Sequence, residues 1–358
     1  MALHVILPMI LPEPPPTALR LRVDAAALAE NWCALDRLSG IARAGAAVKA
    51  DAYGVGVAQA MPALVAAGAR DFFVAHWSEV AAVLDHASPT QVSVLHGVST
   101  AAEAAYAHAV GVRPVINSLQ QAALWHESGG GPCDLMVDTG INRLGIVPSA
   151  IGDPLIAALD VHTLLSHLAS ADEDDPLNAR QLARYREVKA QVRHRDASLA
   201  NSAGIALGTD YAFNLTRPGL SLYGGIARRE LAGVIRQVVY PQAMVLQRRR
   251  IGAGETVGYN ATFTAQADLE VATIAIGYAD GFLRCRGPGF AMQHNGCDLP
   301  VLGRVSMDMT VIDCSGSPSV SVGDFVEIPF DLPADAARSG MSQYELLTTL
   351  GKRFTRQG

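Results

Sequence analysis

The sequence is poor in charged and aromatic residues. Asp, Glu, Lys and Arg make up 17% of its 358 residues and aromatics 6%, whereas half are hydrophobic. Soluble domains carry roughly 25% charged residues, so part of this surface is expected to lie in interfaces between domains or subunits. The net charge of −6 argues against a nucleic-acid partner. The three cations Arg248–Arg250 are interpreted as a solvated strand edge.

Cysteine motifs and membrane segments are also missing. The five cysteines are scattered and never spaced as CxxC, which predicts neither a disulfide framework nor a zinc site, and no bound metal is expected. The apolar stretch Met1–Leu11 contains Pro8, lacks a basic start and precedes a proline-rich segment. It fits neither a signal peptide nor a membrane span. We therefore expect a cytoplasmic protein with no membrane partner.

What is present is a regular alternation of short apolar runs and helical stretches between about Ala46 and Gly224. Such a rhythm is typical of repeated βα units. There are eight runs: Ala46–Lys49, Asp71–Ala75, Val92–His96, Arg113–Asn117, Asp134–Asp138, His162–Ser166, Ser198–Asn201 and Leu220–Tyr223. Eight runs predict a (β/α)₈ barrel of the TIM type rather than an open doubly wound sheet.

After about Leu231 the pattern becomes β-rich, with candidate strands in Glu270–Gly277, Val301–Asp313 and Asp324–Pro329. We therefore divide the chain into an α/β barrel at 19–230 and a C-terminal β-rich domain at 231–358. Residues 1–18 either dangle or add a strand to the second domain, and the second option is favoured.

Functional groups of a barrel come from the carboxyl ends of its strands. Lys49 closes the first run between apolar residues, Arg143 follows the fifth run, His167 follows the sixth and Arg217 precedes the eighth. A solvated lysine is the plain alternative, but a desolvated one has a lowered pKa and becomes a Schiff-base or general-base candidate.

Small residues that can donate hydrogen bonds also lie next to the last two predicted strands. The segments Asn201–Gly204 and Thr216–Gly219 supply hydroxyls and glycine amides after runs seven and eight, where barrels commonly bind phosphate. A lysine beside a phosphate cup predicts pyridoxal 5′-phosphate, whose aldehyde needs an amine and whose phosphate needs such donors.

At this point the sequence resembles the alanine racemases, the pyridoxal-phosphate enzymes of fold type III. The matching motifs occur in the family's order from about Leu21 to Leu350: AAVKADAYGVG (46–56), VDTGINRLGI (137–146), SHLASAD (166–172), NSAG (201–204), TRPGLSLYGG (216–225), VGYNATFTA (257–265), IGYADGFLR (276–284), GRVSMDM (303–309) and YELL (344–347).

The resemblance implies roles for individual residues. Lys49 would bind the cofactor covalently and act as one catalytic base, and Tyr259 would be the opposing base, supplied by the partner subunit of a homodimer. Further contacts to the cofactor would come from Tyr53, His167, Asn201, Ser202, Arg217, Gly219, Leu220 and Tyr344. Arg143 and Met307 would receive the substrate carboxylate, and Asp172, Tyr278 and Arg304 would line the entrance.

The implied chemistry is consistent with these residue types. Racemisation needs two bases on opposite faces of the α-carbon. Lysine and tyrosine have ordinary pKa values near 10, so neighbouring cations, expected to be Arg143 and His167, must lower them. Arg217 at the pyridine nitrogen would disfavour its protonation, whereas decarboxylases sharing this fold place a glutamate there. Arg217 therefore favours a racemase.

One departure concerns Met136. Many alanine racemases have a carbamylated lysine at this position that steadies the arginine seven residues later, and methionine cannot replace it. We expect an alanine racemase that supplies D-alanine for peptidoglycan. The alternatives are an amino-acid racemase of broader specificity and a non-catalytic pyridoxal-phosphate carrier. Tyr278 and Tyr344 at the constriction favour alanine, and carriers lack the β-rich domain and the second base.

Overall fold

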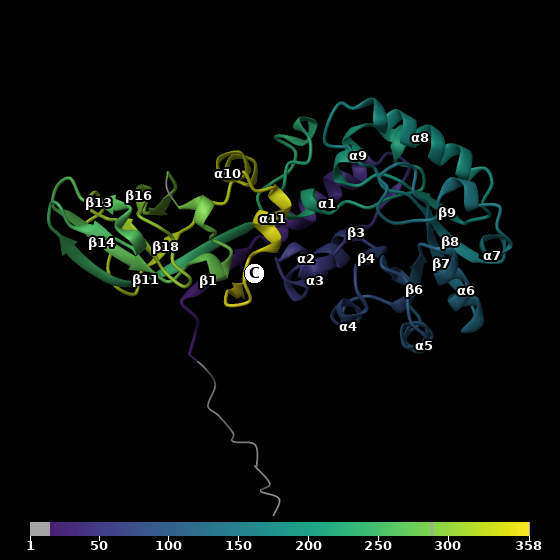
Figure 1. The fold of residues 1–358 in the computed structure, drawn as a ribbon, viewed down its shortest axis with the longest axis horizontal. Helices are drawn as coiled ribbons and strands as arrows, with labels where there is room; N and C mark the ends of the chain where they lie inside the picture. Colours follow the sequence, from purple (N-terminus) through teal and green to yellow (C-terminus); the bar gives the residue numbers. More distant parts are fainter. Residues whose placement is uncertain (1–14, 288, 358) are drawn as a thin grey trace, which may run out of the picture.

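The computed structural model describes residues 15–287 and 289–357. They form two lobes that lie side by side, a barrel of parallel strands and an antiparallel β-rich lobe (Figure 1). The predicted (β/α)₈ barrel followed by a β-rich domain is confirmed. Within the described residues, no helix is long and apolar enough to cross a membrane.

The barrel is closed by hydrogen bonds between its first and last strands. Strands β3 to β9 form one parallel sheet in chain order, and β10 pairs with β2. The amide of Arg43 donates to the carbonyl of Asn214 (3.1 Å), and the amide of Asn214 donates to the carbonyl of Ala197 (3.1 Å). The strands are β2 (Arg43–Ala44), β3 (Ala46–Ala47), β4 (Phe72–Val74), β5 (Val92–Val94), β6 (Arg113–Ile116), β7 (Pro132–Met136), β8 (Asp160–Leu165), β9 (Asp196–Ser198) and β10 (Leu215–Thr216).

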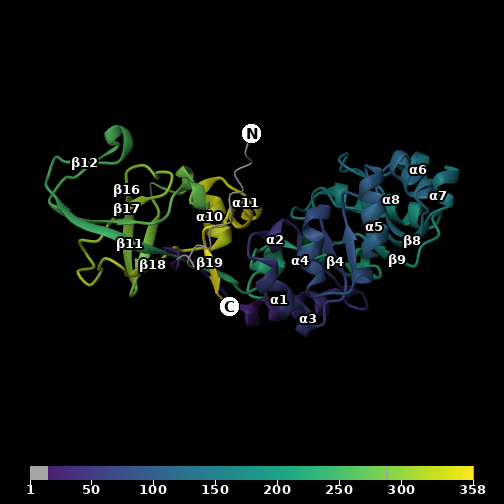
Figure 2. The ribbon, with the colours of Figure 1, turned by 90° about the horizontal axis from the view of Figure 1, so that it is seen from below.

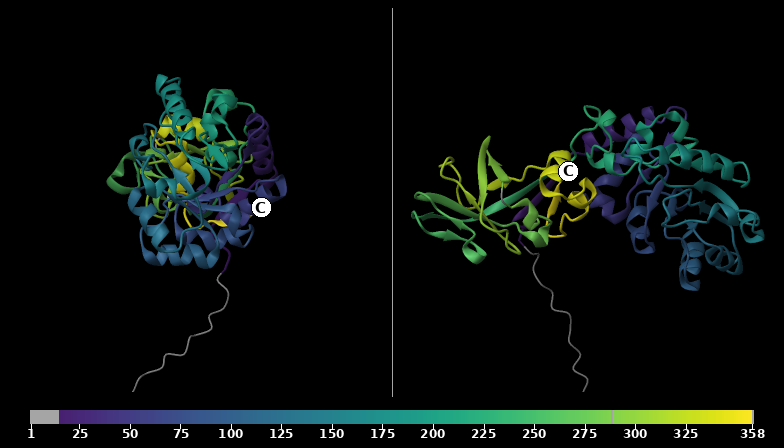
Figure 3. Two further views of the ribbon diagram at one scale, coloured as in Figure 1. Left: turned by 90° about the vertical axis from the view of Figure 1, so that its right-hand side faces the viewer. Right: turned by 45° about the horizontal axis from the view of Figure 1, so that its top comes forward.

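Helices surround these strands, as the end-on view in Figure 3 shows. They are α1 (Ala25–Leu38), α2 (Lys49–Tyr53), α3 (Val57–Ala67), α4 (Val80–Leu84), α5 (Ala101–Val110), α6 (Leu119–Glu127), α7 (Pro154–Ala157), α8 (Pro176–Lys189) and α9 (Ser202–Ala206).

The predicted eighth strand is wrong in position. Leu220–Tyr223 forms a 3₁₀ turn, and the strand that closes the barrel is β10, five residues earlier. All four residues of the turn are buried, and periodicity cannot distinguish a short apolar run buried on every side from a strand. Pro218 and Gly219 separate the two segments.

The second lobe is built on a sheet that closes on itself, because β14 pairs with both β17 and β11. Its strands are β11 (Val239–Ile251), β14 (Leu269–Ile274), β15 (Ala291–His294), β16 (Cys297–Leu302), β17 (Thr310–Asp313) and β18 (Phe325–Glu327), with a separate hairpin of β12 (Thr256–Val257) and β13 (Phe263–Thr264). Two helices follow, α10 (Leu332–Ser339) and α11 (Gln343–Thr348).

Both ends of the described chain belong to this second sheet. Strand β1 (Leu19–Val23) pairs antiparallel with β11 and parallel with β19 (Thr355–Gln357). The predicted barrel boundary at residue 19 is therefore wrong, because Leu19, Leu21 and Val23 bury one face of an added strand in the second lobe. The strand expected within 1–18 is formed by 19–23 instead, and residues 1–14 lie outside the described part.

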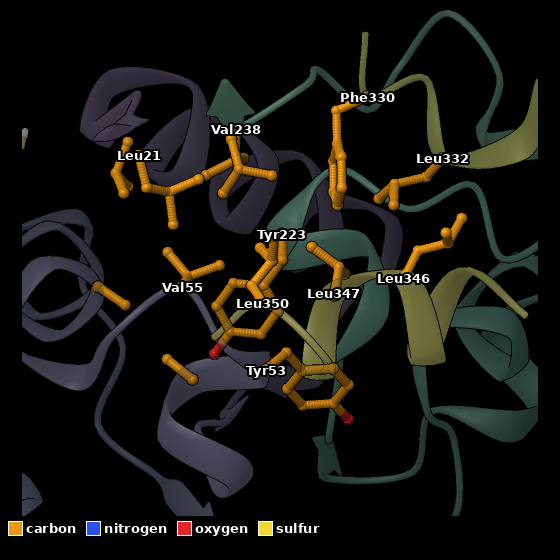
Figure 4. Packing of buried hydrophobic residues seen from close by; sticks show 14 of the residues in the cluster. Leu21, Tyr53, Val55, Tyr223, Val238, Phe330, Leu332, Leu346, Leu347 and Leu350 are labelled. Carbon is orange, nitrogen blue, oxygen red and sulfur yellow. The ribbon is translucent and has the colours of Figure 1, made fainter. Parts of the chain in front are cut away.

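The lobes share one hydrophobic core at α11, which lies between them in both Figure 1 and Figure 2. Leu346, Leu347 and Leu350 belong to the same cluster as Tyr53 and Tyr223 of the barrel (Figure 4). At Gly54, whose φ is +84°, an added Cβ would lie 2.4 Å from the carbonyl oxygen of Leu347. The backbone that carries Tyr53 is thus in close contact with the second lobe.

The opposite end of the barrel contains a buried carboxylate. Asp134, on β7, is fully buried and accepts hydrogen bonds from Ser93 Oγ (2.5 Å), the amide of Thr163 (3.0 Å) and Arg113 Nε (3.3 Å). One side chain therefore joins strands β5, β6, β7 and β8.

We predict that Asp134→Ala destabilises the barrel by about 3–5 kcal/mol, because it leaves the buried Arg113 guanidinium without its counter-ion. The measurement is the midpoint of urea unfolding. Asp210→Ala is the matched control, since Asp210 pairs with Arg186 at 3.6 Å with both side chains exposed, and a change below about 0.5 kcal/mol is expected. Equal shifts for both variants would contradict the role of Asp134.

Candidate active site

A cavity of about 640 Å³ opens at the carboxyl ends of the barrel strands. All the residues predicted to contact the cofactor or the substrate, apart from Tyr259 and Met307, line this cavity. They are Lys49, Tyr53, Arg143, His167, Asn201, Ser202, Arg217, Gly219, Leu220 and Tyr344. Nine come from the barrel, and Tyr344 comes from α11 of the second lobe. The site therefore lies at the junction of the two lobes.

Lys49 lies two residues after β3 and is half-buried at the cavity wall. Burial lowers the pKa of its amine, and the charges of Arg143 and Arg217 lower it further, while Glu79 opposes them. The lysine is therefore more readily neutral, and hence more nucleophilic, than a lysine in water. This environment favours the reactive interpretation of Lys49 over the solvated one.

The segment after Lys49 has an unusual backbone. Ala50, Asp51, Ala52 and Tyr53 all have φ between 52° and 56°, so α2 is a left-handed turn. Left-handed helical geometry costs roughly 1–2 kcal/mol for each residue other than glycine. Strained backbone conformations of this kind are frequent at functional sites, where contacts with the surrounding structure stabilise them. Here the turn directly connects Lys49 to Tyr53.

The hydroxyl of Tyr53 lies among small residues that carry hydrogen-bonding hydroxyl and amide groups. It would lie 2.2 Å from a Cβ added at Gly219, so only glycine allows this approach. Ser202 Oγ accepts from the amides of Gly219 (3.0 Å) and Ser221 (3.2 Å). Tyr344 stands beside Tyr53, with ring centroids 6.2 Å apart. These hydroxyls and amides form a group of the kind that binds phosphate.

Arg217 is buried without a carboxylate partner among the described residues. Its guanidinium donates to the carbonyl of Ser166 (2.6 Å) and to Ser198 Oγ, and burial lowers its pKa to about 10, so it stays charged at neutral pH. Burial and the neighbouring Arg217 lower the pKa of His167 to about 3. His167 is therefore neutral, and the prediction that it acts as a cation near Lys49 is wrong. Arg217 takes that place beside Arg143.

Arg143 is held through its backbone. The carboxylate of Asp138 accepts hydrogen bonds from four consecutive amides, those of Gly140, Ile141 and Asn142 on Oδ1 (2.8, 3.0 and 3.1 Å) and that of Arg143 on Oδ2 (3.0 Å). Met136 lies in the same cavity wall. In this chain, the loop folded around Asp138 fixes where the arginine side chain begins.

Five predicted site residues do not line the cavity. Tyr259 and Met307 are 67% and 53% exposed on the second lobe. Arg304 is exposed near Met307, and the amide of Tyr278 donates to the carbonyl of Ser306 (3.0 Å). Asp172 is exposed near Tyr344, whose pKa is raised by burial and by the Asp172 charge.

The sequence reasoning missed His96, which lines the cavity with its ring 4.2 Å from that of His76. His96 closes the third predicted run, so the strand-end rule that selected Lys49 was available for it too. Among residues 15–287 and 289–357, no group of three His, Cys, Asp or Glu side chains is arranged to hold a metal ion.

Comparison with known proteins matches this architecture. The family models for the alanine racemase N-terminal domain and C-terminal domain match residues 23–227 and 238–358. The chain belongs to the alanine racemase family. The alanine racemase of Rhizobium meliloti is 42% identical, and the match covers 94% of this chain and 96% of that protein. The biosynthetic alanine racemase of Agrobacterium fabrum is 40% identical over 95% of this chain and 93% of its own.

Solved structures of alanine racemases have the same fold. The enzyme of Bartonella henselae, with covalently bound pyridoxal phosphate, superposes with a TM-score of 0.87 at 33% identity, covering 96% of this chain and 99% of that one. The biosynthetic alanine racemase of Pseudomonas aeruginosa gives a TM-score of 0.84 at 31% identity, with the same coverage.

We predict that Asp138→Asn loosens the Arg143 loop of this alanine racemase family member. The amide keeps one acceptor but loses the charge and the second acceptor, and hydrogen bonds to charged groups are worth about 1.5–3 kcal/mol. Trypsin should therefore cut after Arg143 roughly tenfold faster, as followed by mass spectrometry.

The matched control is Asp153→Asn. Asp153 Oδ1 also accepts a backbone hydrogen bond, from the amide of Leu155 (2.9 Å), but it caps α7 away from the cavity. Cleavage after Arg143 should be unchanged in this variant. Unchanged cleavage in Asp138→Asn would show that the loop does not depend on the carboxylate.

Proposed function

We propose that the protein is a homodimeric, cytoplasmic, pyridoxal-phosphate-dependent alanine racemase that supplies D-alanine for peptidoglycan. The observation that carries the proposal is the juxtaposition, in one cavity, of a desolvated lysine, a cluster of hydroxyl and amide donors and a buried arginine without a counter-ion. Membership of the alanine racemase family supports it.

The cavity fits pyridoxal 5′-phosphate. Lys49 supplies the amine for its aldehyde, and Tyr53, Ser202, Gly219, Leu220 and Tyr344 surround a space suited to the phosphate. When bound, the cofactor stabilises negative charge at the α-carbon of an amino acid. Arg217 would face the pyridine nitrogen and, because it stays charged, would keep that nitrogen unprotonated. The neutral His167 would lie beside the ring, and Asn201 would complete the wall.

Lys49 is the base on one face of the substrate. Its amine, with a pKa lowered mainly by burial, removes a proton from the α-carbon or returns one to it. Arg143 projects into the same cavity from the Asp138 loop and binds the substrate carboxylate. Holding the carboxylate fixes which face of the α-carbon meets Lys49, and such orientation of the reacting groups lowers the barrier to proton transfer.

The second base comes from a second copy of the chain. Tyr259 and Met307 are large hydrophobic residues exposed on the second lobe, outside the cavity of their own subunit. In the homodimer, Tyr259 would hold or donate the proton on the opposite face of the α-carbon. Met307 would contact the substrate carboxylate, and Tyr278, Asp172 and Arg304 would narrow the entrance.

We predict that the wild-type chain, loaded with pyridoxal 5′-phosphate, racemises alanine faster than any other L-amino acid. Lys49→Ala should lose at least about 10³-fold in kcat, because covalent attachment and one base are both removed. Chiral chromatography across the twenty amino acids is the measurement. Similar rates for several larger amino acids would favour the broader racemase. Normal racemisation by Lys49→Ala would refute the assignment.

Mixing two inactive variants tests the shared site. If each site joins Lys49 of one subunit to Tyr259 of the other, a Lys49→Ala subunit paired with a Tyr259→Phe subunit contains one intact site and one doubly altered site. After an equimolar mixture is dissociated and reassociated, about a quarter of wild-type activity should return. Each variant dissociated and reassociated alone is the control, because both sites of its dimer then carry the same substitution. No recovery, despite mixed dimers shown by native mass spectrometry, would contradict the proposal.

A further inference from the structure

Glu79 connects two strand ends at the mouth of the barrel. It lies in the turn after β4, where Oε2 accepts hydrogen bonds from the amides of Ala75 (2.7 Å) and His76 (3.0 Å). Its other oxygen, Oε1, accepts from the amide of Ala50 at 2.6 Å. One carboxylate therefore joins the end of β4 to the residue immediately after Lys49.

The hydrogen bond to Glu79 acts on a residue in a strained conformation. Ala50 is exposed, it is the first residue of the left-handed turn, and its φ is 54°. Inside the turn, the amide of Gly54 donates to the carbonyl of Ala50 (2.9 Å), but the Ala50 amide itself points to Glu79. At the far end, Arg356 donates to the carbonyls of Gly54 (2.8 Å) and Val55 (3.1 Å). The strained turn is thus held at both ends.

We infer that Glu79 is a positioning residue that holds the left-handed turn and thereby sets the placement of Lys49 relative to Tyr53. The inference rests on the proposed function, in which these two residues contact the aldehyde and phosphate ends of pyridoxal 5′-phosphate. Without the carboxylate, Ala50 is free to leave the left-handed region, which alanine disfavours. The lysine and the tyrosine hydroxyl then lose their fixed spacing.

A carboxylate is required because both of its oxygens accept hydrogen bonds. In Glu79→Gln, the single amide oxygen can face either Ala50 or the Ala75–His76 pair, and the NH₂ group then meets an N–H on the other side. Size and shape are preserved, so only the second acceptor and the charge are lost.

Glu103 provides a matched control from the next turn of the barrel. Its Oε2 accepts from the amides of Ser99 (2.6 Å) and Thr100 (3.1 Å), which is the same local arrangement after β5. Both glutamates are half-buried. Within the described residues, Oε1 of Glu103 accepts no hydrogen bond from another strand end. In Glu103→Gln, the amide oxygen can therefore accept both backbone hydrogen bonds, and the NH₂ group faces no N–H donor.

The experiment measures the turn and the cofactor separately, on the full chain. Hydrogen exchange of a peptide that begins before Lys49, such as the one covering Ala46–Val57, reports on the Ala50 amide. Absorbance titration of the apo-protein with pyridoxal 5′-phosphate gives the dissociation constant. In Glu79→Gln, exchange should quicken and the dissociation constant should rise, each roughly 10- to 100-fold, the range set by loss of a hydrogen bond to a charged group. In Glu103→Gln, both should stay within about twofold of wild type.

Unchanged exchange and affinity in Glu79→Gln, or equal losses in Glu103→Gln, would overturn the inference. If Glu79→Gln did not fold, fast exchange of the Ala50 amide in the wild-type chain would overturn it, and a protected amide would support it. Racemisation of alanine by the wild type is assayed separately. A wild-type chain that binds pyridoxal 5′-phosphate through the protected turn but racemises nothing would refute the proposed function and leave the role of Glu79 intact.

Discussion

The left-handed turn from Ala50 to Tyr53 is the constraint on which the site depends. It connects a lysine at a strand end to a tyrosine beside the group of hydroxyl and amide donors, and both residues line one cavity. None of the four residues is a glycine, so the strain must be offset by contacts. Those contacts come from Glu79 in the neighbouring barrel turn, Arg356 near the C-terminus and the α11 core. The second lobe therefore supports the chemistry of the first.

Positive charge dominates the cavity. Lys49, Arg143 and Arg217 all line it, while His167 is neutral. The carboxylates of Asp138 and Glu79 hold backbone amides and do not line this cavity. A site of this kind favours anionic ligands, and the proposed cofactor and substrate contribute a phosphate and a carboxylate. Burial and the charges of Arg143 and Arg217 lower the pKa of Lys49, so the cations that favour anionic ligands also help to make a base available.

The sequence predicts features that depend on local pattern. Lys49, Arg143 and His167 could be assigned to the barrel mouth because each follows an apolar run, and parallel strands bring their carboxyl ends together. Leu220–Tyr223 misled because a buried 3₁₀ turn and a buried strand have the same composition. The left-handed turn could not be foreseen, because Ala50, Asp51 and Ala52 carry no signal for positive φ. The roles proposed for Tyr259 and Met307 came only from the family resemblance, because the sequence pattern around these residues carries no signal for a contact with another subunit.

The pairing of β1 with β11 and β19 makes the barrel an insertion within the second lobe. In chain order β1 comes first, some two hundred residues of barrel follow, and β19, the parallel partner of β1, comes after the other strands of the second lobe. The second lobe can therefore complete its sheet only by pairing residues that the whole barrel separates along the chain, and such long-range pairing is intrinsically slow. The contacts of α11 with the left-handed turn likewise join segments that are far apart in the sequence.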